Sequence, residues 1–109
     1  MKCIQGVPYA HERADDLAWL LDSKGFSVTV YNKGGHADHP CVKVESGRWG
    51  LIDRTEYVYL APAEDGRWWF WDTWLEPIAP AKEVSIAADK VARAVAAFRH
   101  GRHLFLVRD

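Results

Sequence analysis

The sequence is poor in cysteine and contains no long hydrophobic run. Two cysteines among 109 residues are too few for the disulfide framework of a small secreted domain. No stretch approaches the roughly 20 apolar residues that span a bilayer, and the segment before Pro8 lacks the apolar run of a signal peptide. These absences predict a cytoplasmic chain whose thiols, Cys3 and Cys41, stay reduced.

An excess of charge is also missing. The 14 basic and 15 acidic side chains leave a formal net charge of −1 and a pI of about 6.5. A chain of this kind has no general attraction for nucleic acid or for an anionic membrane surface. Phosphate-binding loops and nucleophile turns are absent as well, so no reaction is indicated, and the sequence favours a protein that is not an enzyme.

What the chain does contain is a globular composition with many tryptophans. Hydrophobic residues make up 49% and charged residues 27%, which is typical of a folded domain. The length predicts a single domain over residues 1–109 that can bury a core without disulfides. Four of the six tryptophans fall between residues 68 and 74.

Hydrophobic periodicity predicts two helices with strands between them. Apolar residues recur at helical spacing from about Tyr9 to Lys24 and from about Lys82 to His100. Gly25 and Gly101 follow, where a helix end favours a left-handed residue. The segment between the helices alternates with the period of half-buried strands. The predicted strands are 26–31, 41–45, 48–53, 56–61 (either a continuation of the preceding strand or a separate one) and 67–74.

Short turns at residues 46–47 and 63–66 predict that these strands pair as an antiparallel meander. Two prolines three residues apart are expected to exclude regular structure from residues 75–80. The predicted fold is therefore α+β, in the order α-β-β-β-β-α, with both helices packed on one face of a four-stranded sheet. The prediction also allows a short final strand at residues 103–107, after the second helix.

The stretch from Trp68 to Pro80 (WWFWDTWLEPIAP) and the alanine-rich helix after it resemble known sequences. They are similar to small uncharacterised actinobacterial proteins that end in an aromatic strand, a W-x-x-P-I-x-P turn and an alanine-rich helix. The resemblance covers residues 67–97 and implies an actinobacterial, cytoplasmic source, but no activity and no site residue. Leu75 is a departure, since we expect a glycine there in the relatives.

The aromatic strand is the leading candidate for a functional surface. Alternation along a strand puts Trp69 and Trp71 on one face. It puts Trp68, Phe70 and Trp74 on the other. Because helices cover one face alone, the remaining rings either bind a partner or lie under the proline-containing loop that follows. We therefore predict a non-enzymatic interaction or accessory module that binds a protein partner, or a second copy of itself. The predicted binding residues are Trp69, Trp71, Trp74 and Arg67.

A single-stranded nucleic-acid binder is the first alternative. Basic residues gather towards the C-terminus, and cations beside an aromatic platform can hold phosphates while bases stack on the rings. The basic residues of this hypothesis are Arg93, Arg99 and Arg102. The competing interpretation is that these cations offset the dipole of the second helix and solvate its outer face.

A metal-dependent hydrolase is the second alternative. His36, His39 and Cys41 offer nitrogen and sulfur donors within six residues, and zinc at catalytic sites takes three such ligands and a water. The spacing matches no strong zinc signature, and the same loop suits a simple turn. A Cys–His nucleophilic pair would need an activated thiolate, which nothing in the sequence indicates. The sequence indicates no cofactor, apart from the zinc of this second alternative.

Overall fold

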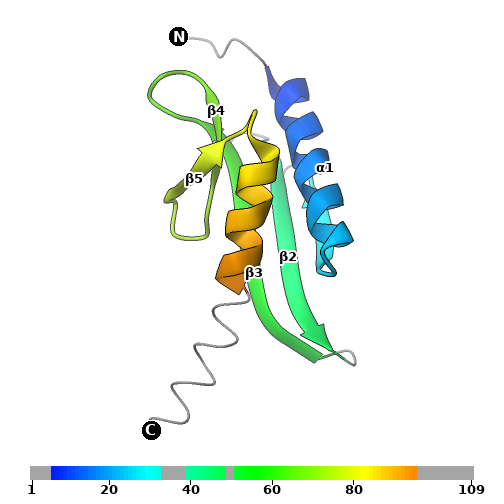
Figure 1. The fold of residues 1–109 in the computed structure, drawn as a ribbon. Coiled ribbons are helices and arrows are strands. Elements are labelled where there is room, and N and C mark those ends of the chain that lie inside the picture. Colours follow the sequence, from blue (N-terminus) through cyan, green and yellow to red (C-terminus); the bar gives the residue numbers. More distant parts are fainter. Residues whose placement is uncertain (1–5, 33–38, 49–50, 96–109) are drawn as a thin grey trace, which may run out of the picture.

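The computed structural model describes the chain over residues 6–32, 39–48 and 51–95, and these residues form an α+β fold (Figure 1). The elements are α1 (Val7–Ser23), β1 (Ser27–Tyr31), β2 (Cys41–Arg48), β3 (Leu51–Pro62), β4 (Trp68–Trp71), β5 (Pro77–Pro80) and a second helix over residues 84–95. The five strands pair antiparallel in chain order, β1-β2-β3-β4-β5. The predicted meander is thus confirmed, with one strand more than expected.

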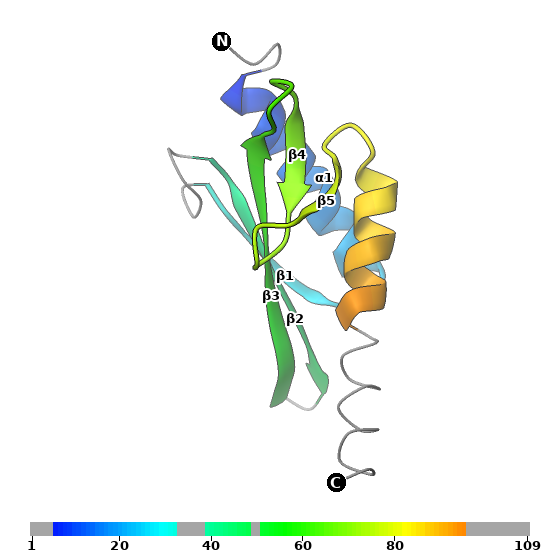
Figure 2. The same ribbon diagram turned by 90° about the vertical axis from the view of Figure 1, so that its left-hand side faces the viewer.

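Both helices lie on the same side of the sheet (Figure 2). The core forms between them and the sheet, where side chains such as Leu17 of α1, Val42 of β2 and Ala87 of the second helix are fully buried. Phe70 of β4 is the largest fully buried residue of this core. The opposite side of the sheet carries no helix in the described part of the chain.

The strand β5 contradicts the expectation that prolines exclude regular structure from residues 75–80. Ala81 N–H donates to the Trp68 carbonyl at 2.9 Å, which shows that residues 79 and 81 direct their backbone groups towards β4. Pro80, between them, faces outward from the sheet, where a missing N–H breaks no ladder bond. Prolines are tolerated on edge strands for this reason.

Several strand ends also differ from the prediction. The turn expected at residues 46–47 is a bulge between Ser46 and Gly47, and β2 continues to Arg48. Residues 56–61 continue the preceding strand, which was one of the two predicted alternatives, and the single strand β3 begins at Leu51 and ends at Pro62. β4 ends at Trp71 and does not reach Trp74. The optional strand at 103–107 lies outside the described residues.

A tight turn between β4 and β5 explains the early end of β4. The carboxylate of Asp72 accepts the N–H groups of Trp74 at 2.8 Å and Glu76 at 2.9 Å. Leu75 adopts a left-handed conformation with a φ of 64°, and its N–H donates to the Asp72 carbonyl at 2.9 Å. The sequence therefore places a leucine where the backbone favours glycine.

Leu75→Gly is expected to raise the free energy of unfolding by about 0.5–1 kcal/mol. A left-handed conformation costs a non-glycine residue about 1–2 kcal/mol, and the flexibility of glycine in the unfolded chain offsets part of that gain. Little packing is lost, because Leu75 is 69% exposed. Urea denaturation measures the change, with Glu76→Gly as the control, since its φ is not positive. Equal destabilisation by both substitutions would contradict the left-handed conformation of Leu75 in this turn.

Candidate functional site

Aromatic side chains collect on the helix-free face of the sheet. Tyr31 pairs with Cys41, Cys41 with Tyr59, and Tyr59 with Trp71, so one cross-strand row runs from β1 to β4. Directly paired residues point to the same face. Trp68 and Phe70 are buried on the helix side, so this row points away from the helices. We call the surface formed by the following residues the aromatic face: Tyr31, Tyr57, Tyr59, Trp69 and Trp71.

Contacts with neighbouring groups fix several of these rings in place. The rings of Tyr57 and Tyr59 stack with centroids 6.4 Å apart. Trp71 Nε1 donates to the Ala61 carbonyl at 2.9 Å. The ammonium of Lys43 lies 5.8 Å from the centre of the Tyr31 ring. Rings that are held before binding lose less conformational entropy when a partner immobilises them.

A shallow hollow of about 410 Å³ lies at the β4 end of the aromatic face. Trp69, Trp71 and Pro77 form its apolar wall, and the turn at residues 63–65 forms its rim. The four described rings other than Tyr31 are half-buried, and Tyr31 is exposed. The surface is therefore neither a sealed core nor a flat polar face.

Two groups of the aromatic row, Cys41 and Tyr59, keep their protons at physiological pH because their pKa values are raised. Burial raises the pKa of the Cys41 thiol to about 11. Burial also raises the pKa of Tyr59, with smaller contributions from Cys41 and Tyr57. A hydrogen bond with Tyr31 and the charge of Glu45 keep Lys43 protonated by raising its pKa. The charge at this part of the face is thus the Lys43–Glu45 pair, 3.9 Å apart, and no nucleophilic thiolate is present at Cys41.

Two of the three predicted metal ligands lie in packing contacts. The His39 ring packs edge-on against Trp68 with centroids 4.8 Å apart. Cys41 is a buried free cysteine of the aromatic row. His36 lies outside the described residues. Over residues 6–32, 39–48 and 51–95, no three His, Cys, Asp or Glu side chains gather closely enough to hold a metal ion.

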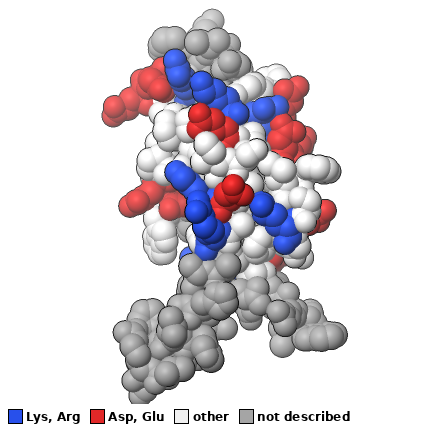
Figure 3. Space-filling model, in the orientation of Figure 1, with Lys and Arg blue, Asp and Glu red and all other residues white. Residues whose placement is uncertain are grey.

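Of the three basic residues of the nucleic-acid hypothesis, the one that the structure describes, Arg93, does not share a surface with the rings. Arg93 is exposed on the second helix, and this helix lies on the opposite side of the sheet from the aromatic face (Figure 2). Arg99 and Arg102 lie outside the described residues. On the helix side, lysine and arginine are interspersed with acidic side chains (Figure 3). Arg93 and the rings of the aromatic face therefore do not form one binding surface.

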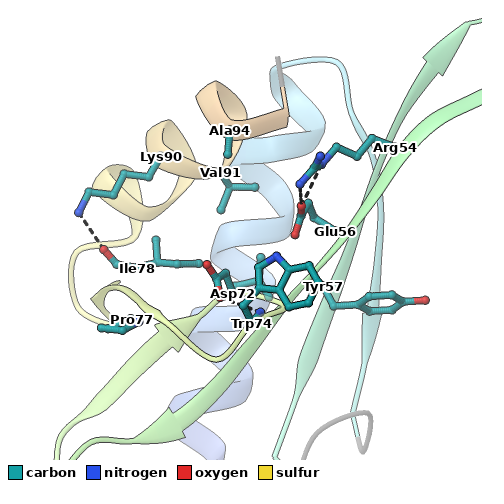
Figure 4. Close-up of a pocket in the computed structure, with 11 residues that line it drawn as sticks. Arg54, Glu56, Tyr57, Asp72, Trp74, Pro77, Ile78, Lys90, Val91 and Ala94 are labelled. Carbon is teal, nitrogen blue, oxygen red and sulfur yellow. Dashed lines mark hydrogen bonds and ion pairs between the residues drawn. The ribbon is translucent and has the colours of Figure 1, made fainter. Parts of the chain in front are cut away.

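Of the predicted partner-binding residues, Trp69 and Trp71 lie on the aromatic face and Trp74 does not. Trp74 is 79% exposed in the β4–β5 turn and lines a cavity of about 270 Å³ between β3, this turn and the second helix (Figure 4). Arg67 is exposed just before β4, where its N–H donates to the Asp65 carboxylate at 2.9 Å.

The polar groups around this cavity bind one another. The Glu56 carboxylate pairs with the Arg54 guanidinium, and Thr73 Oγ1 donates to the same carboxylate at 2.8 Å. The ammonium of Lys90 donates to the Ile78 carbonyl at 2.9 Å. The Tyr57 ring points away from the cavity, towards the aromatic face (Figure 4). These contacts tie the turn and the second helix to the sheet.

Sequence reasoning missed the three tyrosines of the aromatic face and the 70% exposed Trp19 of α1. The tyrosines carry a detectable signal, because Tyr57 and Tyr59 have the same parity along a strand. That signal becomes useful only when the pairing of β3 with β4 is known, since the pairing puts the tyrosines beside the tryptophans.

Comparison with known proteins identifies no relative. No family model, curated protein or solved structure matches this chain. The resemblance of residues 67–97 to actinobacterial proteins stays a prediction. The described helices are too short or too polar to cross a membrane.

Proposed function

We propose that this chain is a non-enzymatic interaction module that binds a protein partner through the aromatic face. The observation that carries the proposal is a group of five aromatic rings, from β1, β3 and β4, on a sheet face that no described helix covers. Large aromatic clusters at a surface usually mark an interaction site.

The chemistry of the face favours a protein over a nucleic acid. Tyrosine and tryptophan are the residues that most often dominate protein–protein binding energy. The neighbouring Lys43–Glu45 pair supplies a polar rim of balanced charge, as is common around an apolar interface centre. A nucleic-acid platform would need a basic groove along the rings, and the helix that carries Arg93 lies on the other side of the sheet.

The size of the face also suits a protein surface. The row of Tyr31, Cys41, Tyr59 and Trp71 crosses four strands spaced about 4.8 Å apart, and the sheet is narrower on either side of this row. The aromatic face therefore suits the centre of an interface, and the polar periphery supplies the rest of the roughly 800 Å² that each partner contributes to a standard interface. The expected partner surface has an apolar centre and a polar periphery.

Trp69→Ala is expected to weaken partner binding at least 30-fold, because removing a central interface tryptophan costs about 2 kcal/mol or more. Trp69 is the ring to change, since Trp71 also bonds the Ala61 carbonyl. Trp19→Ala is the matched control, because it removes an exposed tryptophan from α1 on the opposite side of the sheet. Thermal unfolding verifies that both variants fold.

The binding measurement uses the tagged chain as bait in a lysate of its host, with and without nuclease. The proposal expects one protein that the wild type and Trp19→Ala retain after nuclease and that Trp69→Ala loses. Retention of that protein by Trp69→Ala would overturn the proposal. Retention of nuclease-sensitive material alone would favour the nucleic-acid alternative.

A further inference from the structure

The two edges of the sheet are built differently, and the β5 edge is closed. Pro80 has no N–H to offer, and its position faces outward from β4. The neighbouring outward carbonyl, that of Ile78, accepts the Lys90 ammonium at 2.9 Å. Prolines and lysines at an edge strand are devices that prevent pairing with another chain.

The β1 edge has neither device, since Ser27–Tyr31 (SVTVY) contains no proline, glycine or charged residue. The hydrogen-bonding pattern of the sheet shows which backbone groups of β1 point away from β2. Leu60 N–H donates to the Pro40 carbonyl at 3.3 Å, so even-numbered residues at the start of β2 bond β3, and odd-numbered residues bond β1. The partners of the odd-numbered residues are Ser27, Thr29 and Tyr31. The backbone groups of Val28 and Val30 therefore point outward.

The side chains of the same two valines lie at an open margin of the core. Val28 and Val30 are half-buried, whereas Val44 and Val42, their partners on β2, are fully buried. Among the described strands β1 pairs with β2 alone, so no other described strand bonds the outward backbone groups of Val28 and Val30. The β1 edge thus presents two donors, two acceptors and a strip of apolar surface.

We propose that β1 pairs antiparallel with β1 of a second copy of this chain, in a register centred on Thr29. Val28 of each copy then lies opposite Val30 of the other, and each such pair exchanges two backbone hydrogen bonds. Four bonds satisfy all the outward groups of both valines. The Thr29 side chains meet at the two-fold axis, and threonine pairs are favourable across strands.

The symmetry of the edge favours a second copy over an unrelated peptide. A two-fold interface needs a surface that is complementary to itself, and the alternation of Val28, Thr29 and Val30 provides one. α1 packs on both β1 and β2, so the two α1 helices of the dimer lie about 10 Å apart, an ordinary helix-packing distance. Both aromatic faces lie on one side of the joined sheet and stay accessible.

Sedimentation velocity over about 5–500 µM tests the dimer, because an interface smaller than the standard size is expected to dissociate in the micromolar range. The mass is expected to rise from 12.4 kDa to twice that value. Amide exchange at Val28 and Val30 is expected to slow at least tenfold over the same range.

Thr29→Glu is the deciding variant. Within one copy the new carboxylate faces Lys43 of β2, which suits the monomer, but two carboxylates meet at the dimer axis. We expect at least tenfold weaker association, and recovery on mixing with Thr29→Lys. Ser85→Glu, an equal charge change at an exposed helix position, is the control and is expected to dimerise like the wild type.

A wild-type mass of 12.4 kDa at every concentration would overturn the proposal. Association of Thr29→Glu at the wild-type concentration would also overturn it, because the contact would then lie elsewhere. The result is separate from the function proposed above, since Trp69→Ala leaves β1 unchanged and is expected to dimerise normally.

Discussion

Phe70→Ala is expected to lower the free energy of unfolding by about 3–5 kcal/mol, the usual cost of deleting a buried phenylalanine and leaving a cavity. Phe70 is fully buried between the sheet and the helices. Its neighbours across the ladder, Leu60 of β3 and Ala79 of β5, are buried as well. Such a loss is a large fraction of the 5–15 kcal/mol of a typical domain, so Phe70→Leu, at about 1–1.5 kcal/mol, provides a variant that folds.

Trp69→Ala is the matched control for this prediction. It removes a larger side chain from the adjacent position, but Trp69 is only half-buried and points away from the helices. Its expected cost is therefore smaller, about 1 kcal/mol. Urea denaturation compares the variants. A larger loss for Trp69→Ala than for Phe70→Ala would mean that the two faces of β4 are assigned in reverse.

Cys41 is expected to react with iodoacetamide about 100-fold more slowly than an ordinary thiol, because a pKa about two units higher leaves about 100-fold less thiolate. Burial raises its pKa from 9.0 to about 11. The measurement uses a Cys3→Ser background, so that one thiol is present, and follows alkylation at pH 8 by mass spectrometry. Reaction at the rate of the urea-unfolded protein would contradict the burial of this thiol.

The same pKa shift makes stability depend on pH at alkaline values. A thiol whose pKa is raised on folding stays protonated in the folded state, while the unfolded chain releases its proton more readily. The contribution of Cys41 is therefore fully present below about pH 9 and is lost as the pH rises towards 11. Cys41→Ala is expected to flatten the fall in unfolding free energy over this range, with Tyr59 supplying the slope that remains.

The sequence was sufficient to predict the helices and most of the strands, because each repeats its apolar residues at a period set by local geometry. α1 ends within one residue of its predicted end at Lys24, and Gly25 follows with a φ of 99°. The burial alternation along β4 matches the predicted faces of Trp68 to Trp71. Two helices on one face of an antiparallel sheet follow from these patterns and short turns.

The features that the sequence did not predict depend on contacts between distant residues. Prolines are acceptable in β5 only because it is an edge strand, which is decided by its pairing with β4. Trp74 leaves the strand because Asp72 closes a turn around a left-handed Leu75. Tyr59 joins the tryptophans only through the register of β3 with β4.

Hydroxyl-radical footprinting of the free and partner-bound chain tests the central claim most directly, since it reports the accessibility of each aromatic side chain. In the free chain, Trp69 and Tyr59 are expected to oxidise at rates between those of exposed Trp19 and buried Phe70. Addition of the partner is expected to protect Trp69 and Tyr59 and to leave Trp19 unchanged. Oxidation of Trp69 as slow as that of Phe70 in the free chain, or protection of Trp19 alone, would contradict an open aromatic face that binds a protein.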